Sequence, residues 1–333
     1  IFSSPMHSET PAPAPRSRRD FLQRTGALSL GAFLASLLPG RLGAQSAPRP
    51  AAGVASPGAE TARGRVFVDL RGDGRAEGQR GLAGVLVSNG VDVVATDADG
   101  RYELPVREHD ILFVIKPRGH RVPMDAQNLP RFHYIHKPHG SPDETFIYKG
   151  VAPTGPLPAS VDFALVPQDE PDDFEMIFTA DPQPYELRHV EWYARECVPE
   201  FRAAGAAFGI ALGDIAGDHL DLYTPYNAAN ARAGFPWYHV IGNHDLNYMA
   251  REDAFAAETF KRVYGPVDYA FTYARVHFIV LNNVYWEGFT RLRADGWPRR
   301  GQYRGHLRPS QLEFVRNLAA RIPTDERIVV CTH

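Results

Sequence analysis

The sequence is poor in cysteine, in net charge and in long apolar runs. Its 333 residues include two cysteines, Cys197 and Cys331, which excludes a disulfide-stapled scaffold and a multi-cysteine zinc or iron–sulfur site. The net charge of −3 provides no general basic field, so the chain carries no nucleic-acid-binding signature. Glycine-rich phosphate loops of the dinucleotide or Walker type are also missing, which argues against the nucleotide-binding folds that need them. By contrast, 29 Gly and 28 Pro indicate many turns and exclude an all-helical bundle.

The N-terminal segment has the pattern of an export signal. Arg18 and Arg19 precede an apolar stretch at 26–38, which is too short to cross a bilayer core of about 30 Å. A charged start, a short apolar region and small residues after it are typical of a signal peptide. The paired arginines resemble a twin-arginine signal, with a Sec signal or a core helix as alternatives. We expect a signal peptide over 1–45, a flexible linker over 46–60, an exported, periplasmic or extracellular protein, and no transmembrane helix in the mature protein.

In residues 61–169, apolar residues alternate with other residues, with the period of two that is typical of β-strands. Val66 and Val68 alternate with other residues, and Asn-Gly and Asp-Gly turns follow at 89–90 and 99–100. Short alternating strands separated by such turns predict an antiparallel β-sandwich. The unit resembles the small immunoglobulin-like modules of exported proteins.

The segment 117–160 within this unit is rich in Pro and His. Its histidines lie at 120, 133, 136 and 139, and none of these pairs has the i, i+4 spacing of a metal-binding helix. We therefore expect an ordered excursion that packs on the neighbouring domain, rather than a metal site.

Residues 170–333 alternate strands with helices, which predicts an α/β domain. Apolar runs at 176–178, 208–212 and 238–241 are each followed by acidic or amide residues. Taken alone, an Asp in such a place is commonly a helix N-cap. Taken together, polar groups at the carboxyl ends of several strands meet at one edge of a sheet, where α/β proteins place their sites. Helices are predicted over 187–204, 252–263 and 309–321, and a strand over 328–331.

Four short motifs appear in order in this region. They are Ala180-Asp181-Pro182-Gln183, Gly213-Asp214, Gly242-Asn243-His244-Asp245 and Thr332-His333. This series resembles the calcineurin-like metallophosphoesterase family over about 150 residues, and the Gly-Asn-His-Asp motif is its most specific part. The resemblance implies a four-layer αββα sandwich over 170–333. With the β-rich unit in front, the chain looks like exported members that carry an amino-terminal immunoglobulin-like domain.

The resemblance also implies a centre with two divalent metal ions (Mn, Mg, Fe or Zn). Two ions about 3.5–4 Å apart can bind both oxygens of a phosphate and generate a hydroxide at neutral pH. By resemblance Asp214 bridges the ions, Asp181 binds the first ion, and Asn243 and His333 bind the second. His244 would protonate or stabilise the leaving oxygen, and Asp245 could hold His244 in the right tautomer.

The chain departs from the family pattern at three places. Gln183 stands where the family usually has His, and it would serve as a ligand through its carbonyl oxygen. Gly217 stands where a second carboxylate is usual, with Asp218 one position later. The family's Gly-His-x-His pair is absent, so we expect the natural sequence to continue beyond His333 and this piece to bind metal poorly.

These patterns predict an exported, metal-dependent phosphoesterase. It would hydrolyse a phosphomonoester, phosphodiester or pyrophosphate bond with a metal-activated hydroxide, in a phosphorylated small molecule or a cell-envelope substrate. One alternative is a catalytically silent cell-surface protein that binds through the β-sandwich, which Gln183 and Gly217 would favour. Another is a nucleotide-binding α/β domain of a different kind.

Overall fold

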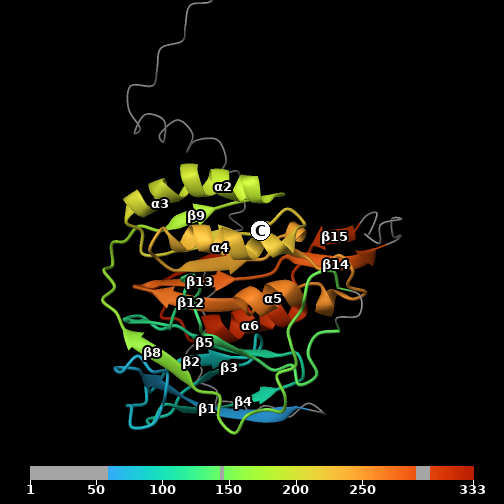
Figure 1. The fold of residues 1–333 in the computed structure, drawn as a ribbon. Helices are drawn as coiled ribbons and strands as arrows, with labels where there is room; N and C mark the ends of the chain where they lie inside the picture. The colour runs from blue at the N-terminus through green and yellow to red at the C-terminus, as the bar shows by residue number, and fades with distance from the viewer. Residues whose placement is uncertain (1–58, 143–145, 290–300) are drawn as a thin grey trace, which may run out of the picture. The chain divides into compact units, whose positions relative to one another are not determined.

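The computed structural model of the chain describes residues 59–142, 146–289 and 301–333 (Figure 1). The predicted signal peptide over 1–45 and nearly all of the predicted linker lie outside these residues. The described residues all belong to one compact unit. Among them we find no helix with the length and apolar character needed to cross a bilayer.

The β-rich part contains two four-stranded sheets. The first has the order β4 (Arg101–Val106), β1 (Glu60–Val68), β8 (Phe163–Pro167) and β6 (His120–Arg121). The second has the order β3 (Val93–Ala95), β2 (Leu86–Ser88), β5 (Ile111–Ile115) and β7 (His133–Ile135). All five side chains of β5, an interior strand of the second sheet, are buried. β4, at the edge of the first sheet, alternates between exposed and buried positions because one face of it meets solvent.

The prediction of a purely antiparallel sandwich is wrong at one strand pair. β8 runs parallel to β1, with Val66 opposite Phe163 and Val68 opposite Leu165. Parallel neighbours need a long crossover, and here the whole chain from β2 to β7 lies between β1 and β8. The sheets are therefore mixed, and the immunoglobulin-like topology stays a prediction.

The α/β part contains two three-stranded sheets and a hairpin. One sheet has the order β11 (Trp237–Val240), β10 (Gly209–Leu212) and β9 (Ile177–Thr179), and the other β12 (Tyr269–Tyr273), β13 (Val276–Val280) and β16 (Arg327–Cys331). The hairpin pairs β14 (Val284–Phe289) with β15 (Gly301–Gly305). Within the described residues of this part, the helices are α2 (Leu187–Glu196), α3 (Val198–Ala204), α4 (Tyr223–Ala231), α5 (Glu258–Tyr264) and α6 (Pro309–Ala319), with short 3-10 turns at Leu220–Leu222, Asn243–Asp245 and Asp253–Phe255.

Two of the predicted helices differ from the observed ones. The helix predicted over 187–204 is interrupted at Cys197, because Pro199 at the start of α3 has no N–H to continue the ladder of α2. The helix predicted over 252–263 begins at Glu258, after a separate 3-10 turn.

Aromatic side chains join the two sheets of the α/β part. The rings of Tyr238 on β11 and Phe271 on β12 stack at 3.8 Å, and Phe208 lies edge-on to Phe278 of β13. Helices α2, α3 and α4 share a second apolar cluster with Trp237 of β11. In Figure 1, α2 and α3 lie beyond β9, and α6 lies beyond β12 on the side of the β-rich part. This packing leaves the ends of β9, β10 and β11 free to carry loops.

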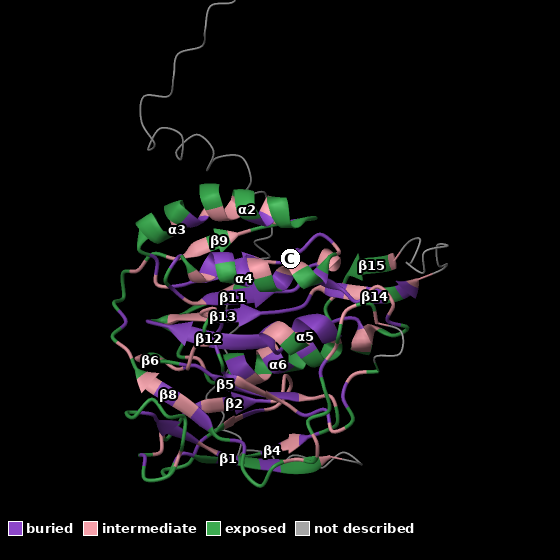
Figure 2. Ribbon diagram, in the orientation of Figure 1, coloured by how far each residue is buried: buried purple, intermediate pink, exposed green. Residues whose placement is uncertain are grey.

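The β-rich and α/β parts share one apolar core. At their junction, Lys116 Nζ lies 2.5 Å from Glu170 Oε1 and 2.6 Å from the carbonyl oxygen of Thr272 on β12. The expected packing of the excursion on the neighbouring part is confirmed, because Asn128 Nδ2 donates to the carbonyl oxygen of Ala231. Figure 2 shows buried residues running through the central strands of both parts. The fold is a β-rich part followed by an α/β part; the four-layer arrangement and the domain boundaries stay predictions.

Candidate metal centre

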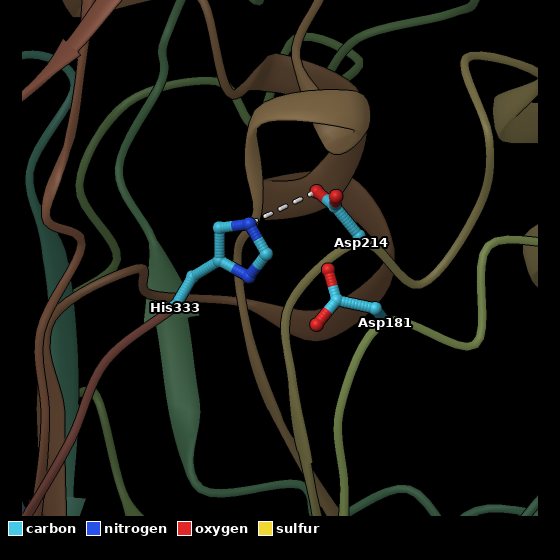
Figure 3. A group of neighbouring side chains, drawn as sticks. All are labelled: Asp181, Asp214 and His333. Carbon is cyan, nitrogen blue, oxygen red and sulfur yellow. Dashed lines mark ion pairs between the residues drawn. The ribbon is translucent and has the colours of Figure 1, made fainter. Parts of the chain in front are cut away.

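Loops from both sheets of the α/β part meet at one place. β9, β10 and β11 are parallel neighbours, so the loops after them, which carry Asp181, Asp214 and Asn243, emerge at the same edge. His333 follows β16 of the second sheet and reaches the same place. Ligand atoms of Asp181, Asp214 and His333 all lie within 4.8 Å of one another, and Figure 3 shows the three side chains pointing toward a common space.

The backbone at these loops adopts a conformation that L-residues rarely take. Asp181 has a φ of 48°, Gln183 of 38°, Asp214 of 51° and Asp218 of 68°. Holding a non-glycine residue at such a positive φ costs on the order of 1 kcal/mol or more in conformational free energy. Residues in this conformation gather at functional sites. The surrounding packing therefore holds these polar side chains in orientations that an ordinary loop would not give.

Two glycines allow the loops to approach each other closely. A Cβ at Gly242 would lie 2.1 Å from the backbone nitrogen of Asp214, and a Cβ at Gly213 would lie 2.5 Å from Nδ1 of His333. Any larger residue would push apart the loops that carry Asp214, Asn243 and His333. The glycines of the Gly-Asp and Gly-Asn-His-Asp motifs are thus steric requirements of the centre.

The ring of His333 is oriented with one nitrogen toward the centre. Its Nδ1 lies 2.9 Å from the carbonyl oxygen of Leu212, so Nδ1 carries the proton and Nε2 is left with a lone pair. Nε2 lies 3.4 Å from Asp214 Oδ1 and 3.1 Å from Asn243 Oδ1. The Asn243 amide is oriented with Oδ1 toward His333 because its Nδ2 donates to the hydroxyl of Tyr303, at 3.1 Å.

This set of atoms fits a divalent cation. Two carboxylates, one amide oxygen and one imidazole nitrogen, all with available lone pairs, face a shared space. Oxygen ligands suit Mg²⁺ or Mn²⁺, and imidazole also suits Zn²⁺ and Fe²⁺. The donor set is therefore consistent with the metal dependence that the motifs imply.

Gln183 does not present its carbonyl oxygen to the centre, as the predicted role of metal ligand would require. Its Nε2 donates to Asp214 Oδ2, at 2.8 Å, and its backbone N–H donates to the carbonyl oxygen of Asp214. Here the amide nitrogen, not the carbonyl oxygen, faces Asp214. A half-turn of the amide would be needed for the ligand role, which stays a prediction.

His244 lies beside the centre and pairs with Asp218. Its Nδ1 is 2.8 Å from Asp218 Oδ1, and its Nε2 is 4.0 Å from Asp214 Oδ2. The hydrogen bond to Asp218 raises the pKa of His244 against the opposing effect of burial. Burial opposes the shift of Asp218 as well, but the hydrogen bond from His244 lowers its pKa overall. The ring is thus held by one nitrogen with the other turned toward the metal ligands.

The expectation that Asp245 orients His244 needs correction. The Asp245 carboxylate is fully buried and accepts hydrogen bonds from the backbone N–H groups of Ile215, Ala216 and Gly242, and from the hydroxyl of Tyr223. These donors engage both oxygens of the carboxylate, and the side chain that pairs with His244 Nδ1 is Asp218. Burial raises the pKa of Asp245 to about 7 against those backbone hydrogen bonds.

Three residues at the site were not identified from the sequence as participants. Asp218, which lies one position after the usual second carboxylate, could have been found because it is the nearest carboxylate after Asp214 in the sequence. Tyr185 lies edge-on to the His244 ring with centroids 6.3 Å apart, and its place four residues after Asp181 is a weak signal. Tyr303 comes from β15, and no motif marks it.

Comparison with known proteins also supports a phosphoesterase. Residues 69–150 match the family model described as the N terminal of calcineurin-like phosphoesterase. The matched segment precedes the residues of the candidate centre, so the family match and the site geometry are separate observations. A search of curated proteins gave no match. Together the match and the acidic and histidine cluster point to the metallophosphoesterases, a family that is typically metal-dependent.

Proposed function

We propose that the protein is an exported hydrolase of phosphate esters that works with two divalent metal ions. The observation that carries the proposal is the convergence of Asp181, Asp214 and His333 within 4.8 Å, with His244 directly beside them. The substrate is a phosphomonoester, phosphodiester or pyrophosphate, on a small molecule or in the cell envelope. Export rests on the sequence pattern of residues 1–45.

The side chains divide into two ligand groups around a shared carboxylate. Asp181, Asp214 and Gln183 would hold one ion, and Asp214, Asn243 and His333 the other. When bound, divalent ions would lower the pKa of a coordinated water and place positive charge next to the phosphate oxygens. Asp214 is buried, with an exposed fraction of 2%, which fits a carboxylate shared by two cations because it is removed from competing water.

His244 supplies the proton that the leaving oxygen needs. Nδ1 is engaged by Asp218, so the proton to be transferred is on Nε2, the nitrogen that faces Asp214. The backbone N–H of His244 also donates to Asp214 Oδ1, at 2.9 Å, which fixes the residue relative to the proposed shared ligand. A histidine so placed acts as a general acid for the departing alkoxide.

The test uses the full-length protein with added Mn²⁺. We expect hydrolysis of a generic aryl phosphate, and a loss of rate of at least about a hundredfold in Asp214→Asn and in Asn243→Ala. Asp221→Asn, which changes charge on an exposed position of the neighbouring turn, is the matched control. Metal content is measured on the same samples: two ions support the enzyme, whereas less than one ion with no hydrolysis supports the silent binding protein.

A further inference from the structure

The side chain of Tyr185 borders the position of the proposed general acid. Tyr185 lies in the loop between β9 and α2, and 48% of its surface is exposed. Its ring is edge-on to that of His244, with centroids 6.3 Å apart and an interplanar angle of 78°. A large, half-exposed aromatic ring therefore lies next to the histidine that would protonate the leaving oxygen.

The loop after β10 supports this ring from beneath. A Cβ at Gly217 would lie 2.6 Å from both Cδ1 and Cε1 of Tyr185, so the ring rests directly on the glycine backbone. The N–H of Gly217 donates to the carbonyl oxygen of Pro184, at 2.9 Å, which joins the two loops. Glycine at position 217, where a carboxylate was expected, is thus what the Tyr185 ring requires.

Two further rings extend the surface away from the centre. His189 lies edge-on to Tyr185 and accepts a hydrogen bond from its backbone N–H at Nδ1, at 3.2 Å. His189 in turn stacks on Trp192 of α2, with centroids 5.3 Å apart and an interplanar angle of 25°. Because the neighbouring rings are packed against each other, the orientation of Tyr185 is set before any ligand arrives.

We infer that Tyr185 determines specificity by receiving a planar aromatic leaving group. The inference rests on the proposed function, since it assumes that a phosphate oxygen is protonated at His244. The group attached to that oxygen must lie beside His244, and on the side of the β9–α2 loop the neighbour is the exposed ring of Tyr185. Aromatic rings attract each other in offset or edge-to-face contact beyond the effect of area alone, so an aryl ester is favoured over an alkyl ester.

The test compares two non-hydrolysable ligands, phenylphosphonate and methylphosphonate, on the full-length protein loaded with Mn²⁺. Their dissociation constants are measured by calorimetry or by competitive inhibition. We expect the phenyl compound to bind about tenfold more tightly in the wild type. Tyr185→Phe should keep this preference, whereas Tyr185→Ala should remove it and leave the affinity for methylphosphonate unchanged.

Two additional variants keep the result interpretable. Gly217→Ala places a methyl group where the ring now rests, so it should reduce the phenyl preference in the same way as Tyr185→Ala. Leu312→Ala truncates an exposed apolar side chain of α6 and should leave the preference intact. Thermal unfolding of each variant checks that it is folded.

The outcomes separate this inference from the proposed function. If methylphosphonate binds but the wild type shows no preference for phenylphosphonate, or if Tyr185→Ala retains the preference, the inference fails and the phosphoesterase remains. If neither compound binds the metal-loaded protein and Asp214→Asn does not change the activity, the proposed function is wrong, and the inference about Tyr185 is then wrong as well.

Discussion

The carboxylate of Asp218 holds the imidazole of His244 at 2.8 Å, although the two residues come from loops after different strands. The pair leaves Nε2 of His244 turned toward Asp214. Asp218 is thus a positioning residue for the proposed general acid, one residue later in the chain than the carboxylate expected from the family pattern.

Substitution of this carboxylate should affect catalysis more than metal binding. In Asp218→Asn we expect kcat for an aryl phosphate to fall about 10–100-fold, because partners that orient a functional histidine are typically worth that much. Mn²⁺ affinity measured by calorimetry should stay within about twofold. Asp221→Asn serves as the control. A variant with full kcat would show that Asp218 does not position His244.

The buried carboxylate of Asp245 should be a determinant of stability. Asp245→Ala removes the acceptor of three backbone N–H groups and of the Tyr223 hydroxyl, and we expect a loss of about 3–5 kcal/mol in the free energy of unfolding. Asp245→Asn keeps the shape but turns an NH₂ group toward donors, so about 1–3 kcal/mol should be lost. Urea denaturation measures both. A change below about 0.5 kcal/mol in the Ala variant would contradict this account.

The close approach at Gly242 should be needed for metal binding. In Gly242→Ala the new Cβ would lie 2.1 Å from Asp214 N and Oδ1, so the two ligand loops must separate. We expect Mn²⁺ affinity to fall at least about tenfold, as for other disturbances of the groups that orient metal ligands. In the matched control, Gly305→Ala, the added Cβ meets nothing within 4 Å and the affinity should not change. Equal affinities in the two variants would show that the loops tolerate the methyl group.

The ion pair at the junction should couple the stability of the β-rich and α/β parts. Lys116→Met leaves the buried Glu170 without its cation, and we expect a loss of about 3–5 kcal/mol. Glu170→Gln alone leaves the buried ammonium unpaired and should cost a similar amount, whereas the double variant should recover part of the loss. Denaturation followed by tryptophan fluorescence and by far-ultraviolet circular dichroism provides the measurement. Additive losses in the double variant would mean that the pair does not interact.

Two histidines packed within the fold, the buried His239 and the half-buried His133, should make the protein sensitive to mild acid. Burial lowers the pKa of His133 to about 4 and that of His239 to about 3, against about 6.5 in the unfolded chain. Because the unfolded state then binds more protons, stability falls as the pH drops below about 6.5, and the fall levels off below the folded pKa values. Between pH 7.5 and pH 5 each histidine should cost about 2 kcal/mol.

A phenylalanine at either position tests this linkage. His239→Phe keeps a ring that can stack on Tyr264, as His239 does at 4.0 Å, but it cannot take up a proton. The difference in urea midpoint between pH 7.5 and pH 5 should shrink in this variant. Replacing the exposed His139 by Gln should leave the difference as in the wild type. An unchanged difference in His239→Phe would remove His239 from the explanation.

Local sequence patterns predicted most strands and the order of the motifs. The alternation at Val66 and Val68 and the apolar run before Asp214 correspond to β1 and β10, because alternation and short apolar runs report which faces are buried. The parallel entry of β8 beside β1 was not predictable, since strand direction depends on how a long excursion returns and not on the residues of the strand itself. The interruption at Cys197 could have been predicted from Pro199.

Local sequence patterns identify the polar residues that follow buried strands, and they group Asp181, Asp214, Asn243 and His333 as one candidate set. The partner of each side chain, in contrast, is defined by the folded chain: Asp218 rather than Asp245 at His244, Tyr303 at Asn243, and Tyr185 on Gly217. The two kinds of information differ in how far apart along the chain the interacting residues lie. Burial and strand period are local properties that neighbouring residues record, whereas a hydrogen bond between side chains from separate loops depends on backbone angles and close contacts that no short stretch of sequence specifies.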